Sequence, residues 1–306
     1  MYEPADEEMV MTADVAATTP RWFRAAIEEL PERREVEVAG ASIRLRCWGR
    51  ENTPGVVLVH GGSAHSGWWD HIAPLLAASH RVVALDLSGH GDSDVRSRYP
   101  LGLWADEVVA AAEAGGISGK PYVVGHSMGG WVTAAVGALR ATDAAGLVII
   151  DSPLFDEPPE EVILRQLNRK SRAHPSRDEI LSRFRTEPRQ DTLLPYVARH
   201  VAEESVRQTE AGWIWKFDPD MFRKRHESGD RVQLRKLLPD VQVPAIYIRC
   251  ELGMVSPEMS AEIAGLFGQP ATVVELADAG HHPMMDQPLP LVATLRTVLA
   301  QWDSRR

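Results

Sequence analysis

The sequence predicts an α/β protein with a mostly parallel sheet flanked by helices and an inserted helical cap. Three observations support this class: short, almost continuous apolar runs recur along the chain, helix-like segments separate them, and one long charged interval interrupts the alternation. Such apolar runs are typical of parallel strands that are buried on both faces. With 306 residues, the chain is long enough for one large domain with a sizeable core.

The first part of the chain precedes this alternation. Residues 1–19 are polar, and we expect them to be disordered. The spacing of apolar residues predicts an amphipathic helix over 19–30, with Thr19 as N-cap and Pro20 at the first helical position. Alternating apolar and polar residues on both sides of a turn at Gly40 then predict an antiparallel hairpin.

The alternation itself defines the core. The predicted strands are 55–60, 81–87, 122–127, 146–152, 245–250 and 271–277, and the predicted helices are 68–78, 101–114, 128–140 and 289–302. Between Pro153 and Pro239 there is no clear strand, so we interpret this charged, helical stretch as an insertion. We therefore expect a core of residues 20–152 and 240–306 and a cap of residues 153–239.

Charge and composition exclude several partners. The formal net charge of −10 argues against nucleic acid, which needs clustered Lys and Arg. The N-terminus lacks the basic and apolar regions of a signal peptide, and no apolar run reaches membrane length. Cys47 and Cys250 lie inside apolar runs, which is typical of reduced thiols in a core. We therefore expect a cytoplasmic protein that acts on a small molecule, and its oligomeric state stays open.

The strongest motif is GHSMG at residues 125–129, which lies between an apolar strand and a helix. A sharp strand-to-helix turn of this kind projects the serine hydroxyl at the carboxyl edge of the sheet. The N-terminus of the following helix favours the negative charge that develops there. Ser127 is therefore the candidate nucleophile.

A second Gly-rich turn, His60-Gly61-Gly62, ends the strand at 55–60. A serine nucleophile needs backbone N–H donors that bind the oxyanion of its tetrahedral intermediate. We expect the Met128 N–H group to be one of these donors and the Gly62 N–H group to be the other, with Ser63 as the alternative to Gly62.

The candidate general base comes from DAGHHPMMDQP (278–288), which follows the last strand. A histidine in this loop can take the proton of the serine and later give it to the leaving group. His281 is the candidate, because it directly follows Gly280 and lies five residues before Asp286. We interpret His282 as a neighbour that packs or lines the site, and His126 as a satisfied or surface histidine.

These motifs, together with DLSGHGDSD (86–94), resemble those of the α/β-hydrolase fold in order and spacing, over roughly residues 35–303. The resemblance implies that fold and assigns its usual roles to Ser127, His281, Met128 and Gly62. A serine nucleophile distinguishes the chain from the haloalkane dehalogenases and epoxide hydrolases of this fold, which use Asp there.

The acid that should orient His281 is not at its usual place. The turn after strand 245–250 commonly carries an aspartate in this fold, but here it contains Glu251 and no Asp. Asp151 ends the neighbouring strand and keeps the order Ser, acid, His. Adjacent strands lie ~4.8 Å apart, so Asp151 is also within reach of the histidine loop. We favour Asp151, keep Glu251 as the fallback, and rank Asp86 last.

The predicted function is hydrolysis of a carboxylic ester of a small to medium, partly apolar substrate through an acyl-enzyme, with neither metal nor cofactor. The alternatives are hydrolysis of a lactone, an amide, a thioester or a carbon–carbon bond by the same triad, and a non-catalytic ligand receptor. The expected pocket residues are Trp68, Trp131, Trp213, Trp215 and Met284. We expect Trp213 and Trp215 to point in opposite directions, so that at most one of them faces the site.

Overall fold

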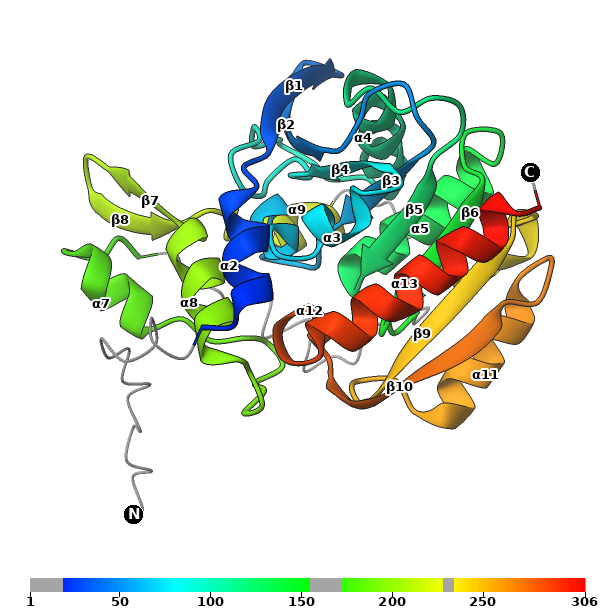
Figure 1. Cartoon of the computed structure of the whole chain (residues 1–306). Coiled ribbons are helices and arrows are strands. Elements are labelled where there is room, and N and C mark those ends of the chain that lie inside the picture. Colours follow the sequence, from blue (N-terminus) through cyan, green and yellow to red (C-terminus); the bar gives the residue numbers. More distant parts are fainter. Residues whose placement is uncertain (1–18, 155–171, 228–233, 306) are drawn as a thin grey trace, which may run out of the picture.

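The computed structural model describes residues 19–154, 172–227 and 234–305 (Figure 1). The segment that was expected to be disordered therefore lies outside the described residues, except for residue 19. Two parts of the expected cap, 155–171 and 228–233, also lie outside them.

The core is one eight-stranded sheet in the order β1-β2-β4-β3-β5-β6-β9-β10. Its strands are β1 (Glu32–Val38), β2 (Ala41–Trp48), β3 (Gly55–Val59), β4 (Arg81–Leu85), β5 (Tyr122–His126), β6 (Gly146–Ile150), β9 (Ala245–Leu252) and β10 (Thr272–Gly280). All neighbours from β4 to β10 are parallel, and the β1–β2 hairpin adds two antiparallel pairings at one edge. The mostly parallel sheet is confirmed.

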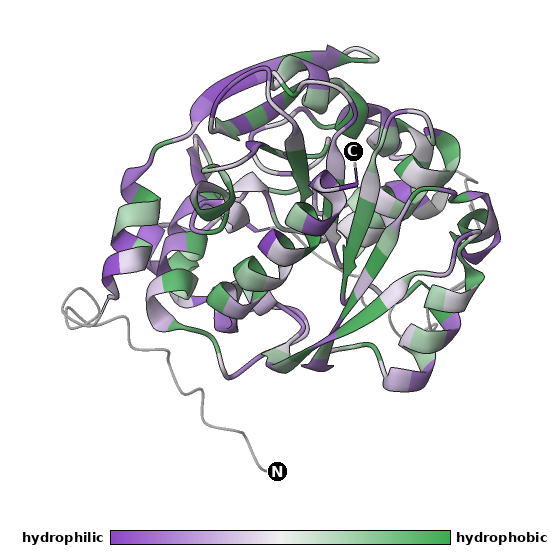
Figure 2. Cartoon of the chain, turned by 45° about the vertical axis from the view of Figure 1, so that its right-hand side comes forward, coloured by the Kyte–Doolittle hydropathy of each residue, from purple (hydrophilic) through white to green (hydrophobic). Residues whose placement is uncertain are grey.

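Helices cover both faces of this sheet (Figure 1). One face carries α2 (Arg21–Glu28), η1 (Ser66–Trp69), α3 (Ala73–Leu76) and α13 (Pro288–Asp303); the other carries α4 (Leu101–Ala114), α5 (Met128–Leu139) and α11 (Pro257–Leu266). Along β3, Val56 and Leu58 pack into the first layer and Val57 and Val59 into the second. This two-sided burial is why β3 is apolar along its whole length and why green dominates the central strands in Figure 2.

Between β6 and β9 the chain forms a segment that we call the insertion, residues 172–227 and 234–240. It contains α7 (Arg177–Ser182), α8 (Pro195–Glu204), β7 (Val206–Thr209), β8 (Gly212–Trp215), α9 (Met221–Glu227), α10 (Leu234–Leu237) and η2 (Leu238–Asp240). The expectation of no strand here is wrong, because β7 and β8 form an antiparallel hairpin. Its tight turn ends at Gly212, whose φ of 120° favours glycine.

Several element boundaries also differ from expectation, and three of these differences have a clear structural reason or consequence. The predicted helix 68–78 is divided into η1 and α3, because Pro74 lacks an N–H group and is accommodated only in a first helical turn. Helix α2 begins at Arg21, so Pro20 is its N-cap instead of its first residue. Strand β10 continues to Gly280 through an irregularity that follows Leu276, and this extension leads directly into the histidine loop.

The expectations drawn from composition can be compared with the structure in two places. Cys47 and Cys250 are both buried free thiols, as predicted, and burial raises the pKa of Cys47 to about 11. Within the described ranges, every helix is too short or too polar to cross a lipid bilayer.

Candidate active site

Ser127 stands between β5 and α5 in a strained backbone conformation. Its φ of 53° and ψ of −120° lie outside the regions that L-residues usually adopt. A Cβ atom on Gly129 would approach the His60 carbonyl oxygen to 2.6 Å, and one on Gly125 would collide with the Gly129 carbonyl. Only glycine fits on both sides of the turn, which explains the spacing of the motif and lets the serine side chain project from the sheet.

His281 follows β10 and lies between the serine and an aspartate. Its Nε2 atom is 3.0 Å from Ser127 Oγ, and its Nδ1 atom is 2.8 Å from Asp151 Oδ2. A carboxylate only accepts hydrogen bonds, so Nδ1 carries the hydrogen and Nε2 keeps a lone pair for the serine hydroxyl. The side chains of His281 and Asp151 are both buried.

The sheet brings Asp151 to this position. His126 is in register with Ile150 on the neighbouring strand, so the next residues, Ser127 and Asp151, leave the same edge of the sheet together. The Asp151 N–H group donates to the carbonyl of Ile248, which ties the turn to β9. Two further backbone donors, the N–H groups of Cys250 and Met254, bind the Asp151 carboxylate at 3.2 and 2.7 Å.

The turn after β9, which has no aspartate of its own, therefore surrounds the carboxylate of Asp151. A Cβ atom on Gly253 would lie 2.6 Å from Asp151 Cγ, so this turn closes on the carboxylate only because residue 253 has no side chain. The two other candidate acids have different partners. Glu251 is exposed and accepts the N–H of Asp278 at 2.8 Å, and Asp86 accepts the N–H of Ser66 at 2.7 Å.

Gly253→Ala is expected to lower kcat about 100-fold, because a misplacement of ~1 Å in a catalytic group can cost that much. The added methyl group would push the Asp151 carboxylate away from His281. The matched control is Gly265→Ala in α11, where a Cβ atom meets nothing within 4 Å. Steady-state kinetics of both variants on one ester test this, and an unchanged kcat in Gly253→Ala would contradict it.

The turn after β3 lies against the nucleophile. A Cβ atom on Gly61 would be 3.4 Å from Ser127 Cβ, and one on Gly62 would be 3.7 Å from Met128 Sδ. Met128 is the first residue of α5, and the first N–H groups of a helix have no partner within it. Ser63 follows with a φ of 60°. The structure thus brings the predicted oxyanion residues, Gly62 with its alternative Ser63 and Met128, to one side of Ser127.

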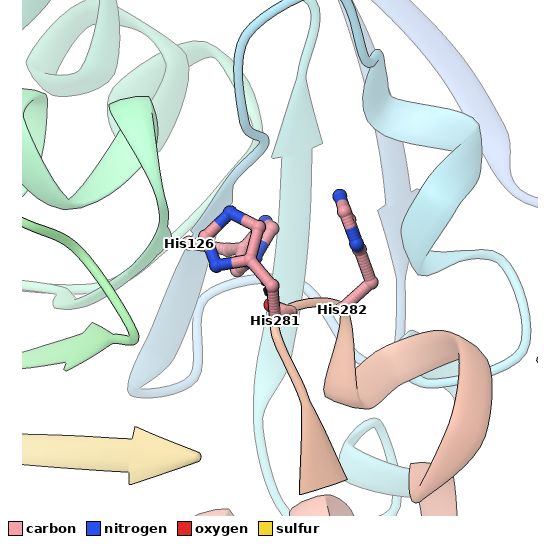
Figure 3. A group of neighbouring side chains, drawn as sticks. All are labelled: His126, His281 and His282. Carbon is pink, nitrogen blue, oxygen red and sulfur yellow. Dashed lines mark hydrogen bonds between the residues drawn. The ribbon is translucent and has the colours of Figure 1, made fainter. Parts of the chain in front are cut away.

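Two more imidazoles surround His281 (Figure 3). Its ring centroid lies 4.8 Å from that of His126, at the end of β5, and 4.7 Å from that of His282. His126 Nε2 donates to the carbonyl of His281 at 2.7 Å, so His126 is satisfied, as expected. Burial, reinforced by the nearby His281, holds the pKa of His126 and His282 well below the usual range, so both rings are neutral at physiological pH.

A glutamine of the insertion holds the histidine loop in place. Gln190 accepts the N–H of His282 at 3.0 Å through Oε1 and donates through Nε2 to Asp286 Oδ2 at 2.6 Å. Asp286, the last residue of α12 (Pro283–Asp286), also accepts the N–H of Gly280 at 2.7 Å. Burial raises the pKa of Asp286. Sequence reasoning missed Gln190, because nothing around it distinguishes it from other polar residues.

Two of the predicted pocket residues belong to a row of aromatic rings that starts at the site. The Trp68 ring lies 5.5 Å from His282 and 6.5 Å from Phe184, and the Phe184 ring lies 6.2 Å from Trp215. Phe222 lies next to the turn after β3, since a Cβ atom on Gly62 would be 3.0 Å from its Cζ atom. Phe184 was not among the residues proposed from the sequence.

The other three predicted pocket residues have different surroundings. Trp213 exchanges two backbone hydrogen bonds with His174 within the insertion. The indole of Trp131 donates to the Pro153 carbonyl, and Met284 is buried in the core, where its carbonyl meets His71 Nε2. The expectation that Trp213 and Trp215 point in opposite directions is wrong, because residues two apart on a strand such as β8 share a face.

Comparisons with known proteins agree with this architecture. Residues 56–295 match the model of the alpha/beta hydrolase family. The esterase Rv0045c of Mycobacterium tuberculosis is 28% identical over 96% of this chain and 98% of its own length. The dihydrolipoyllysine-residue acetyltransferase component of the acetoin cleaving system of Pseudomonas putida is 28% identical, and the match covers 84% of this chain and 66% of that protein.

Solved structures show the same fold. E-2-(acetamidomethylene)succinate hydrolase superposes with a TM-score of 0.76 at 20% identity, covering 88% of this chain and 99% of that one. A crystal structure of the M. tuberculosis esterase gives 0.69 at 23% identity, covering 94% and 97%. Because the family model matches most of the chain, the protein belongs to the α/β hydrolase family. It is a hydrolase with esterases among its relatives.

Proposed function

We propose that the protein is a serine esterase that cleaves small to medium, partly apolar carboxylic esters with Ser127, His281 and Asp151. The observation that carries the proposal is the position of His281, whose two ring nitrogens lie 3.0 Å from the Ser127 hydroxyl and 2.8 Å from the Asp151 carboxylate. A nucleophile, a base and a group that orients the base are the parts that acyl transfer to serine requires.

The proposed reaction has two halves. Ser127 Oγ bonds to the ester carbonyl carbon while its proton passes to His281 Nε2, and the N–H groups of Met128 and Gly62 bind the resulting oxyanion. The bond to the alcohol then breaks, and His281 gives the proton to the departing oxygen. Water attacks the acyl-enzyme in the same way, which releases the acid and restores Ser127. Asp151 stabilises the imidazolium that forms in each half.

The surroundings of the serine support the proposed substrate class. Trp68 and Phe184 near His282, and Phe222 near Gly62, are apolar neighbours of the site, which suits an acyl or alkyl group of moderate size. We further propose that the insertion caps the site, since it supplies Phe184, Phe222 and Gln190. Several relatives carry names of the same class: pimeloyl-[acyl-carrier protein] methyl ester esterase of Methylococcus capsulatus and methylesterase 3 of Arabidopsis thaliana.

A fluorophosphonate probe tests the nucleophile. We expect labelling at one serine, and peptide mass spectrometry should locate it at Ser127, with Ser63 and Ser152 as unlabelled internal controls. A folded protein that does not react at Ser127 would refute the esterase proposal and favour a ligand receptor. A panel of esters of increasing acyl and alcohol length, with lactones, amides, thioesters and diketones, then tests the substrate class. If the protein turns over any other substrate class faster than esters, the bond of that class would take the place of the ester bond in the proposal.

A further inference from the structure

The turn between β10 and α12 carries His281, the base of the proposed mechanism (Figure 3). Hydrogen bonds hold the backbone of this turn on both sides of that residue. Before it, the N–H group of Gly280 donates to Asp286 Oδ2 at 2.7 Å. After it, the N–H group of His282 donates to Gln190 Oε1 at 3.0 Å. The direction in which the His281 side chain leaves the backbone is therefore set in part by Asp286 and Gln190.

Gln190 connects these two hydrogen bonds, because its amide binds the partners of both. Its Oε1 atom accepts a backbone N–H, which leaves Nε2 as the donor to Asp286 Oδ2, at 2.6 Å. The amide can come this close because residue 280 is glycine: a Cβ atom there would be 2.4 Å from Gln190 Cδ. One side chain of the insertion thus fixes the backbone before and after His281.

The segment 190–194, which we call the strap, binds the histidine loop at two further points. Thr192 Oγ1 donates to Asp286 Oδ2 at 3.2 Å. The N–H group of Leu194 donates to the carbonyl of Met285 at 2.9 Å. These bonds exist only while the insertion lies against the histidine loop. The orientation of the base therefore depends on a part of the chain that lies outside the sheet.

We propose that Gln190 is a positioning residue for His281, so that the triad is assembled only while the strap is seated on the histidine loop. The inference rests on the proposed function, since it gives Gln190 an effect on kcat through the base. Gln190 acts on the backbone around His281 and not on the reacting atoms. A movement of the insertion that lifts the strap releases that backbone and turns the base away from Ser127.

Gln190→Glu in the full chain tests this, because it keeps the size of the side chain and replaces the N–H donor with an oxygen. At neutral pH two carboxylates then face each other at Asp286 Oδ2 and repel. We expect kcat on an ester to fall at least about 10-fold, because small displacements of a catalytic group are costly. KM should change less, since Gln190→Glu leaves Trp68 and Phe222 in place.

The pH profile separates positioning from a general loss of stability. A proton shared by Glu at position 190 and Asp286 restores a donor, and the contact between two carboxyls raises the pKa at which that proton is lost. His282, the other titratable group beside residue 190, is already neutral. As pH rises through the pKa of the pair, the activity of Gln190→Glu should fall. The activity of the unmodified protein should only rise, as His281 loses its proton.

Two further variants complete the comparison. Gln190→Met removes both hydrogen bonds without adding charge, so kcat should be lower at every pH, without the additional fall at high pH. Gln208→Glu makes the same chemical change at an exposed position of β7, within the insertion but away from the strap, and should change neither kcat nor the profile. Unmodified kcat and profile in both variants of Gln190, each shown to be folded by circular dichroism, would overturn the proposal.

Proton NMR of the free protein measures the position of His281 without a substrate. The hydrogen between His281 Nδ1 and Asp151 Oδ2, which are 2.8 Å apart, should give a far-downfield resonance. We expect this resonance to shift or broaden in Gln190→Glu and to stay in place in Gln208→Glu. An identical resonance in both would contradict the positioning. If the unmodified protein neither labels with the fluorophosphonate nor hydrolyses esters, the esterase proposal fails, and the resonance still decides whether Gln190 positions His281.

Discussion

Ser127→Ala is expected to lower kcat on an ester substrate by about 10⁶-fold, the scale found when the nucleophile of a triad is removed. The methyl group cannot form the acyl-enzyme, so only water attack assisted by the oxyanion donors and by substrate binding remains. Binding of a non-hydrolysable ester analogue should be retained, because the alanine leaves the surrounding pocket intact.

The control for this variant is Ser304→Ala at the exposed end of α13, where the hydroxyl donates only to the carbonyl of Gln301. Its kcat should equal that of the unmodified protein. A fall of less than about 10-fold in Ser127→Ala would mean that another group attacks the substrate, since losing a true nucleophile costs several orders of magnitude.

Asp151→Asn is expected to lower kcat about 10⁴-fold with the fold retained. The amide has the size of the carboxylate, but it can present N–H to His281 Nδ1 and favour the tautomer whose Nε2 carries the hydrogen. That tautomer cannot accept the Ser127 proton. The Met254 N–H group also loses its acceptor, because it shares Oδ2 with His281, whereas the oxygen at the Oδ1 position still accepts from Cys250.

Glu251→Gln is the matched comparison, because it makes the same chemical change at the exposed fallback acid. We expect little change in kcat, since the Glu251 carboxylate binds the Asp278 N–H group instead of His281. Circular dichroism and kinetics on both variants decide between the two. A large loss in Glu251→Gln with a small one in Asp151→Asn would transfer the role of the acid to Glu251.

The parts of the fold that could be predicted from the sequence are those with strong local patterns. Buried parallel strands such as β3 are apolar at every position, and this pattern remains visible without knowledge of their neighbours. The β7–β8 hairpin was missed because each strand has only four residues and its neighbours are charged. Such short strands become recognisable only when the partner is known.

The candidate site also contains both residues that could be predicted from the sequence and residues that could not. Ser127 and His281 could be proposed from motifs, and Asp151 from the rule that adjacent parallel strands end at one edge. The contributions of Gly253 and Gln190 could not, because each depends on a contact between distant segments. Nothing near either residue in the sequence indicates that one leaves room for a carboxylate and that the other holds the histidine loop.

The backbone conformation of Ser127 has a thermodynamic consequence. A non-glycine residue in such a sparsely populated region costs of order 1–3 kcal/mol, which the rest of the fold must offset. Glycine would relieve this cost and abolish the hydroxyl. Selection for folding stability alone would therefore favour glycine at position 127, and the serine is retained only while its chemistry is under selection. At position 127, the substitution that would raise thermal stability is therefore also one that would abolish turnover.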